Sequence, residues 1–115
     1  MKILGTAVML DEVVETCTKA VEVWGDEQIG VCMEECAELI QALSKCWRLR
    51  KGQPVRGLTA EEIRGNVIEE MSDVLIMIQQ IQKLLGIHSV EIWASMDRKA
   101  DRLKEVIAKI KEDKN

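Results

Sequence analysis

The chain has 115 residues and a formal net charge of −4, and this length suits one domain with its own hydrophobic core. Its single proline, its lack of phenylalanine and tyrosine, and its many Glu, Lys, Leu, Ile and Ala residues favour helices. The small acidic excess argues against a surface that binds nucleic acid or anionic membranes. No segment is long and apolar enough to span a bilayer, and the apolar start meets Asp11 too early for a signal peptide. We therefore expect one cytoplasmic all-α domain over residues 1–115, with its four cysteines reduced and packed as small buried side chains.

Apolar residues recur with a helical period in four stretches, and no stretch alternates as a strand would. The predicted helices cover about residues 6–23, 27–50, 59–85 and 89–112. Thr59 and Glu62 have the spacing of a capping box at the start of the third helix. Gly86 is a natural C-terminal glycine, and Ser89 is a candidate N-cap for the fourth helix. Four amphipathic helices with short connections predict a four-helix bundle.

Two pairs of carboxylates with the same i, i+3 spacing lie in the middle of two predicted helices. The pairs are Glu35 with Glu38 and Glu70 with Asp73. On a helix the members of each pair lie about 60° apart around the axis. Glu35 and Glu70 each fall at the centre of an apolar stripe, with Glu38 and Asp73 on the same flank. Because ionised carboxylates on a buried face are costly unless a positive charge compensates them, the four residues predict a bound cation.

The ligand atoms available at these positions are all oxygens, which favour a hard cation such as Mg²⁺ or Mn²⁺ over zinc. Mg²⁺ uses few protein carboxylates and completes its coordination with water and substrate phosphate, which suits phosphoryl chemistry. Three other polar residues of the same helix are expected to point away from the Glu35 stripe. They are Glu34, Gln41 and Ser44.

Further polar residues share the faces of these apolar stripes. Lys99 is centred in the stripe of the fourth helix with Arg102 beside it, and a lysine there needs an anion, either the acidic cluster or a bound phosphate. Gln28 lies one helical repeat before Glu35 and either contacts a base or ribose or caps the core. Asn66 faces the same side as the carboxylates and is a candidate ligand for water or substrate.

Three other interpretations compete with a catalytic metal site. A buried Glu–Lys ion pair would explain one or two of these charges, but not four inward carboxylates against one inward lysine. A ferritin-like redox bundle needs Glu-x-x-His pairs, and the chain has a single histidine. A non-catalytic helical interaction module that keeps an acidic metal site remains an alternative, and metal dependence would distinguish it.

The two carboxylate pairs, within residues 34–39 and 69–75, resemble the E-x-x-E … E-x-x-D motif of the all-α nucleoside triphosphate pyrophosphohydrolases. This group is the MazG-like superfamily. Residues 24–28 and 99–103 are also similar to its short single-domain members from bacteria and phages. The resemblance covers roughly residues 24–103.

The resemblance implies a MazG-type fold that works as a homodimer or homotetramer. It implies Mg²⁺-dependent hydrolysis of a nucleoside triphosphate between the α and β phosphates, which yields nucleoside monophosphate and pyrophosphate. Phosphoribosyl-ATP pyrophosphohydrolysis is the near alternative within the same fold. Carried over by position, the metal ligands, one of which would activate water, are Glu35, Glu38, Glu70 and Asp73. Lys99 and Arg102 would neutralise phosphate charge. One of the three tryptophans, Trp24, Trp47 and Trp93, could stack on a base, whereas packing in the core or at an interface is the alternative for each.

Overall fold

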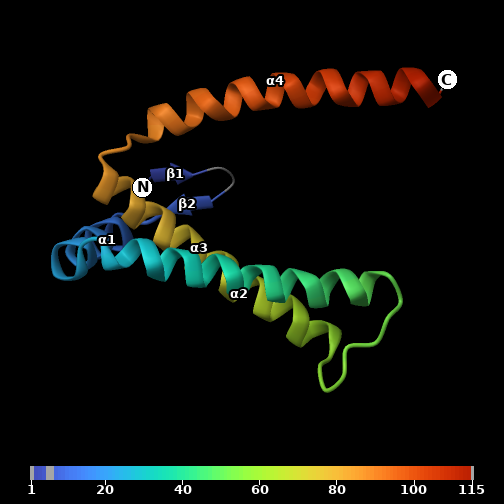
Figure 1. The fold of residues 1–115 in the computed structure, drawn as a ribbon, viewed down its shortest axis with the longest axis horizontal. Helices are drawn as coiled ribbons and strands as arrows, with labels where there is room; N and C mark the ends of the chain where they lie inside the picture. The colour runs from blue at the N-terminus through green and yellow to red at the C-terminus, as the bar shows by residue number, and fades with distance from the viewer. Residues whose placement is uncertain (1, 5–6, 115) are drawn as a thin grey trace.

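The computed structural model describes residues 2–4 and 7–114 of the chain. Within this part of the chain, two short strands precede four long α-helices, and the predicted all-α class is confirmed by these helices (Figure 1). The elements are β1 (Lys2–Leu4), β2 (Ala7–Met9), α1 (Asp11–Trp24), α2 (Glu27–Arg50), α3 (Ala60–Leu85) and α4 (Ser89–Lys114).

The N-terminal hairpin differs from the prediction, which extended the first helix back to about residue 6. The strands β1 and β2 pair antiparallel with Ile3 opposite Val8, and α1 begins only at Asp11. A short apolar run cannot be assigned to helix or strand from its periodicity alone. Asp11 and Glu12 supply the acidic first turn that favours a helix start at this point. The predicted start of the first helix is therefore wrong, and residue 6 itself lies outside the described residues.

The predicted ends of α2 and α3 are confirmed. The helix α2 spans the predicted residues, and α3 begins after a complete capping box. In this box the backbone N–H of Glu62 donates to Thr59 Oγ1 at 3.1 Å, and the backbone N–H of Thr59 donates to Glu62 Oε1 at 3.2 Å. Gly86 ends α3 with a φ of +67°, a left-handed conformation that favours glycine.

At the junction between α3 and α4, the polar side chains have different roles from those predicted. Ser89 is the first residue of α4 rather than its N-cap, and its hydroxyl accepts a hydrogen bond from Gln82 Nε2 at 3.2 Å. The carboxylate of Glu91 instead accepts the backbone N–H of His88 at 2.8 Å. An acidic side chain thus satisfies a free donor at the start of α4.

The helices α2 and α3 form an antiparallel pair, and α1 packs mainly on α3 (Figure 1). Among the residues whose burial is described, 10–114, the buried apolar ones are Cys17, Ala42, Ile63 and Met77. Four glutamines are buried with them, namely Gln28, Gln79, Gln80 and Gln82. The packing of α2 against α3 therefore sets the relative positions of the two carboxylate motifs.

The last helix, α4, extends away from the other three in Figure 1 and buries none of its described residues. The radius of gyration is 17.6 Å, whereas a compact chain of this length has about 13 Å. Within one chain, three of the four helices therefore pack together and the fourth leaves its apolar stripe in solvent.

The cysteines are free, but only Cys17 is buried as predicted. Cys32 and Cys46 are half-buried, and Cys36 is exposed. None of the helices in the described part of the chain is long and apolar enough to cross a membrane.

Candidate metal centre

The α2/α3 pair brings three of the four predicted carboxylates together. Glu35 and Glu38 project from α2 and Glu70 projects from α3, and one oxygen of each lies within 4.8 Å of the others. The antiparallel arrangement makes this possible because each motif lies near the middle of its helix. Oxygen atoms at this separation can share one hard divalent cation.

Asp73 is exposed and lies at the edge of this group rather than within it. Its charge nevertheless reaches the cluster, because it raises the pKa of both Glu35 and Glu70. The structure therefore places the fourth predicted residue beside the cluster, where it could complete a metal's coordination directly or through water.

Burial is the main reason why the pKa values of Glu35 and Glu70 are raised, and neighbouring carboxylates add to it. Glu38 contributes the largest of these charge effects at both residues, and Asp73 follows. Atom Oε2 of Glu35 and atom Oε2 of Glu70 are inaccessible to solvent, and neither has a hydrogen-bond partner among the described residues. Buried oxygens without partners are costly, and a cation would relieve both the missing partners and the repulsion.

A cavity of about 390 Å³ opens beside the cluster. Its lining residues are Glu38, Gln41, Ala42, Lys45, Ile63, Asn66 and Glu70. Asn66 therefore lies where the sequence predicts it, on the side of the carboxylates. Small-molecule sites have volumes of roughly 300 to 1,000 Å³, so this cavity is large enough for a polar group such as a phosphate chain.

Two residues of this cavity were not predicted from the sequence. Gln41, which was expected to point away, lines the rim because the cavity opens along the flank of Glu38 rather than over Glu35. Lys45 is half-buried and is the one cation among the described residues that line the cavity. The signal for both is their spacing from Glu38, since positions i+3 and i+7 share one helix face.

Gln28 belongs to the core and not to the cavity. It is 7% exposed, and its Nε2 donates to Oε1 of Gln80 on α3 at 2.7 Å. Of the two roles that the sequence leaves open, the structure places Gln28 in the core-capping role.

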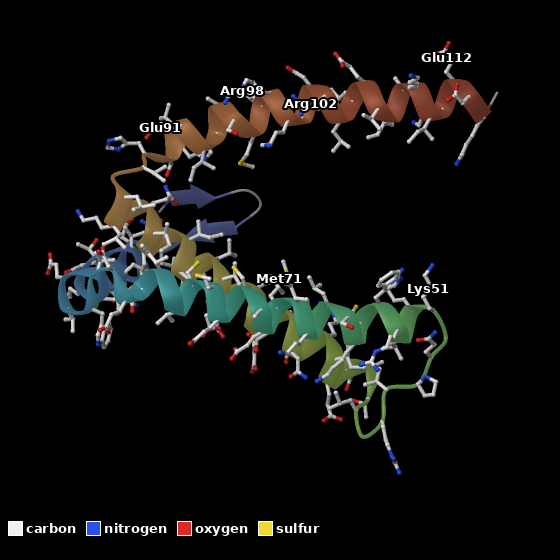
Figure 2. The ribbon with its side chains drawn as sticks, in the orientation of Figure 1. Lys51, Met71, Glu91, Arg98, Arg102 and Glu112 are labelled. Atoms are coloured by element: carbon white, nitrogen blue, oxygen red, sulfur yellow. The ribbon has the colours of Figure 1, made fainter. Side chains whose placement is uncertain are left out.

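The structure does not bring Lys99 and Arg102 to the carboxylates. Both residues are exposed on α4, and Figure 2 shows Arg102 on that helix, apart from the α2/α3 pair. A buried Lys99 would need an anion beside it. Within one chain, however, the apolar stripe around Lys99 is exposed, so Lys99 needs no such partner. Lys45 is the cation that the single chain provides near the cluster.

Comparisons with models of protein families, with curated protein sequences and with solved structures give no match for this chain. Three clustered carboxylates, a fourth at the edge and a polar cavity with one lysine fit a divalent cation and an anionic ligand that the cation helps to bind.

Proposed function

We propose that the protein is a Mg²⁺-dependent nucleoside triphosphate pyrophosphohydrolase of the MazG type, with Mn²⁺ as a substitute metal. The observation that carries the proposal is the meeting of Glu35, Glu38 and Glu70 beside a polar cavity. The products would be a nucleoside monophosphate and pyrophosphate. The spacing of the two motifs, which resembles that of the MazG-like superfamily, supports cleavage between the α and β phosphates.

The carboxylates have distinct parts in this proposal. Glu35 and Glu70 supply the inaccessible oxygens that a cation would bind, and Glu38 and Asp73 lie toward the open side. Glu35, Glu38 and Glu70 would hold the cation, which would supply the charge neutralisation and the water activation that phosphoanhydride hydrolysis needs. One of the four carboxylates orients the attacking water or accepts its proton, and exposed Glu38 and Asp73 are the accessible candidates.

Lys45 and Asn66 would bind the phosphate chain. Both line the cavity with Glu38 and Glu70, and Lys45 is half-buried, where its charge is less screened than at the surface. Lys45 would thus take, within one chain, the phosphate-neutralising role that the resemblance implies for Lys99 and Arg102.

Matched variants of one helix test this proposal. Glu38→Gln keeps the side-chain shape and removes one negative charge, so we expect turnover to fall by at least about 100-fold, because metal positioning supplies much of the transition-state stabilisation. Glu34→Gln makes the same chemical change on the same helix, outside both the cluster and the cavity lining, and it should stay near wild type. The assay is pyrophosphate release from a panel of canonical and damaged nucleoside triphosphates and phosphoribosyl-ATP.

The outcomes separate the competing functions. Hydrolysis of phosphoribosyl-ATP alone would favour the near alternative within the same fold. Wild-type turnover in Glu38→Gln on a substrate that the parent hydrolyses would refute the assigned role of the cluster. A parent that binds Mg²⁺ and hydrolyses nothing would favour the non-catalytic interaction module.

A further inference from the structure

A second cavity lies where α1, α3 and the start of α4 meet, away from the carboxylate cluster. Its volume is about 310 Å³. Figure 1 shows the junction of α3 and α4 at the end of the α2/α3 pair opposite to the loop that joins α2 to α3. Gln82 lines this cavity and lies about 18 Å along α3 from Glu70, at 1.5 Å per residue. The two cavities share none of the described residues and are therefore separate.

Two glutamines that are almost fully buried form part of the wall of this second cavity. Gln79 is 7% exposed and Gln82 is 6% exposed, and both line the cavity. Their i, i+3 spacing places them about 60° apart around α3, so they share one face of the helix. Glutamine is seldom buried unless its amide is hydrogen-bonded. The hydrogen bonds of these two amides therefore indicate what the cavity can bind.

The amide of Gln82 has an acceptor without a donor. Its Nε2 donates to the backbone carbonyl of Ile87 at 3.5 Å and to Oγ of Ser89 at 3.2 Å. Because a carbonyl oxygen only accepts, the bond to Ile87 fixes which end of the amide is the nitrogen. Atom Oε1 of Gln82 is then buried and has no hydrogen-bond partner among the described residues. Such an acceptor is costly, and an N–H or O–H group of a ligand would remove that cost.

The amide of Gln79 makes no hydrogen bond to the described residues either. The next residue, Gln80, differs, because its Oε1 accepts Nε2 of Gln28 at 2.7 Å within the core. A carboxamide offers a donor and an acceptor side by side, which is the pattern that pairs with the edge of a nucleobase such as adenine. Gln79 and Gln82 together therefore present a donor and two acceptors at one wall of the cavity.

The other walls of the cavity suit a flat ring with one anionic group. Val14 on α1 and Ile87 after α3 supply apolar surface beside the two amides. Lys83 and His88 line the cavity as exposed residues, next to the N-terminus of α4. A lysine and a helix N-terminus both favour an anion. Glu91 already accepts the backbone N–H of His88, so an anion here would depend mainly on Lys83.

We propose that this second cavity binds a nucleoside monophosphate, with the base against Gln79 and Gln82 and the phosphate beside Lys83. The volume of about 310 Å³ lies at the lower end of the range for small-molecule sites, which suits one base with its sugar. No carboxylate is among the described residues that line the cavity, so it offers no ligands for the metal that accompanies a phosphate chain. The site is separate from the metal centre and does not depend on the proposed activity.

Nuclear magnetic resonance of the isotope-labelled full-length chain in Mg²⁺ tests this binding. The ligands are the 5′-monophosphates of adenosine, guanosine, cytidine and uridine, and ribose 5-phosphate is the control that lacks a base. We expect at least one monophosphate to shift the side-chain amide resonances of Gln79 and Gln82, and ribose 5-phosphate to leave them in place. Equal shifts with ribose 5-phosphate, or no shift with any monophosphate, would overturn the proposal. Shifts confined to residues around Glu38 and Glu70 would also overturn it, because the ligand would then occupy the first cavity.

Adjacent glutamines provide matched variants for the same ligand. Gln79→Met keeps the length of the side chain and removes its amide, so we expect the affinity to fall by about 10-fold. Its melting temperature should stay the same or rise, because the Gln79 amide has no hydrogen bond within the described chain to lose. Gln80→Met is the control, since Gln80 is 5% exposed, bonds to Gln28 and does not line the cavity. It should lower the melting temperature by about 4 °C or more and leave the affinity unchanged.

These variants separate binding from a purely structural role. Wild-type affinity in Gln79→Met would overturn the proposal, whatever its melting temperature. Lower affinity with an unchanged or higher melting temperature in Gln79→Met, beside wild-type affinity in Gln80→Met, would support it.

Discussion

Without metal, the protein should become less stable as the pH rises, whereas a divalent metal should make it more stable. Folding raises the pKa of Glu35 and Glu70 above the ordinary value of 4.5, through burial and through the charges of neighbouring carboxylates. The folded state therefore holds protons more tightly than the unfolded state at these residues. Their favourable contribution is fully present below pH 4.5 and is lost as the pH rises through the raised pKa values. In EDTA, the melting temperature should fall over this range.

Mg²⁺ should reverse this loss at neutral pH. Mg²⁺ at about ten times its Kd adds about 1.4 kcal/mol to the free energy of unfolding. An unfolding entropy of about 2.1 cal/mol/K per residue gives roughly 0.24 kcal/mol/K for 115 residues, so the melting temperature should rise by about 6 °C. Mn²⁺ should act in the same way. Below pH 4.5 the effect should vanish, because protons then occupy the ligand oxygens.

The assay is thermal unfolding followed by circular dichroism, in EDTA and in MgCl₂ at matched ionic strength. Glu70→Gln is the informative variant, because it removes repulsion and a ligand together. It should melt above wild type in EDTA at neutral pH and gain little from Mg²⁺. Identical melting curves for wild type in EDTA and in Mg²⁺ would refute the metal site, and a melting temperature that rises with pH in EDTA would refute the electrostatic account.

Three further substitutions test other parts of the structure. Lys45→Met should raise the KM for the nucleotide by about 10-fold to 100-fold, because it removes a charged hydrogen bond worth about 1.5 to 3 kcal/mol. The control is Lys51→Met at the exposed end of α2, which should leave the KM unchanged within error. Ile63→Ala should lower the free energy of unfolding by about 2 to 5 kcal/mol in urea titrations, because Ile63 is 2% exposed in the core. Thr59→Ala breaks the capping box and should cost about 1 kcal/mol in the same titrations, whereas Thr59→Ser should cost less because the hydroxyl stays.

The boundaries of α3 were predictable because local chemistry sets them. The capping box at Thr59 and the left-handed Gly86 act within one turn of their own helix, so sequence spacing was enough to place both ends of α3. The N-terminal strands were not predictable in this way. They depend on pairing between Ile3 and Val8, and each apolar run is too short for its period to separate strand from helix.

The apolar pattern of α4 could not predict which surface this helix packs against. A stripe around Leu103 has the same period whether it packs in its own chain or against another chain. Lys99 was therefore expected beside an anion, either the acidic cluster or a bound phosphate, although its side chain is exposed on α4. The carboxylate cluster itself was predictable, because Glu35 and Glu70 are central in stripes that face one another whenever α2 and α3 pair.

In the proposed function, this carboxylate cluster directs cleavage of a nucleotide between its α and β phosphates. Phosphorus NMR of a nucleoside triphosphate panel, incubated with the protein and Mg²⁺, tests it most directly because each product has its own resonance. We expect pyrophosphate and nucleoside monophosphate to appear in equal amounts from at least one substrate, and we expect EDTA to abolish both. Nucleoside diphosphate with inorganic phosphate, or the same products in EDTA, would contradict it.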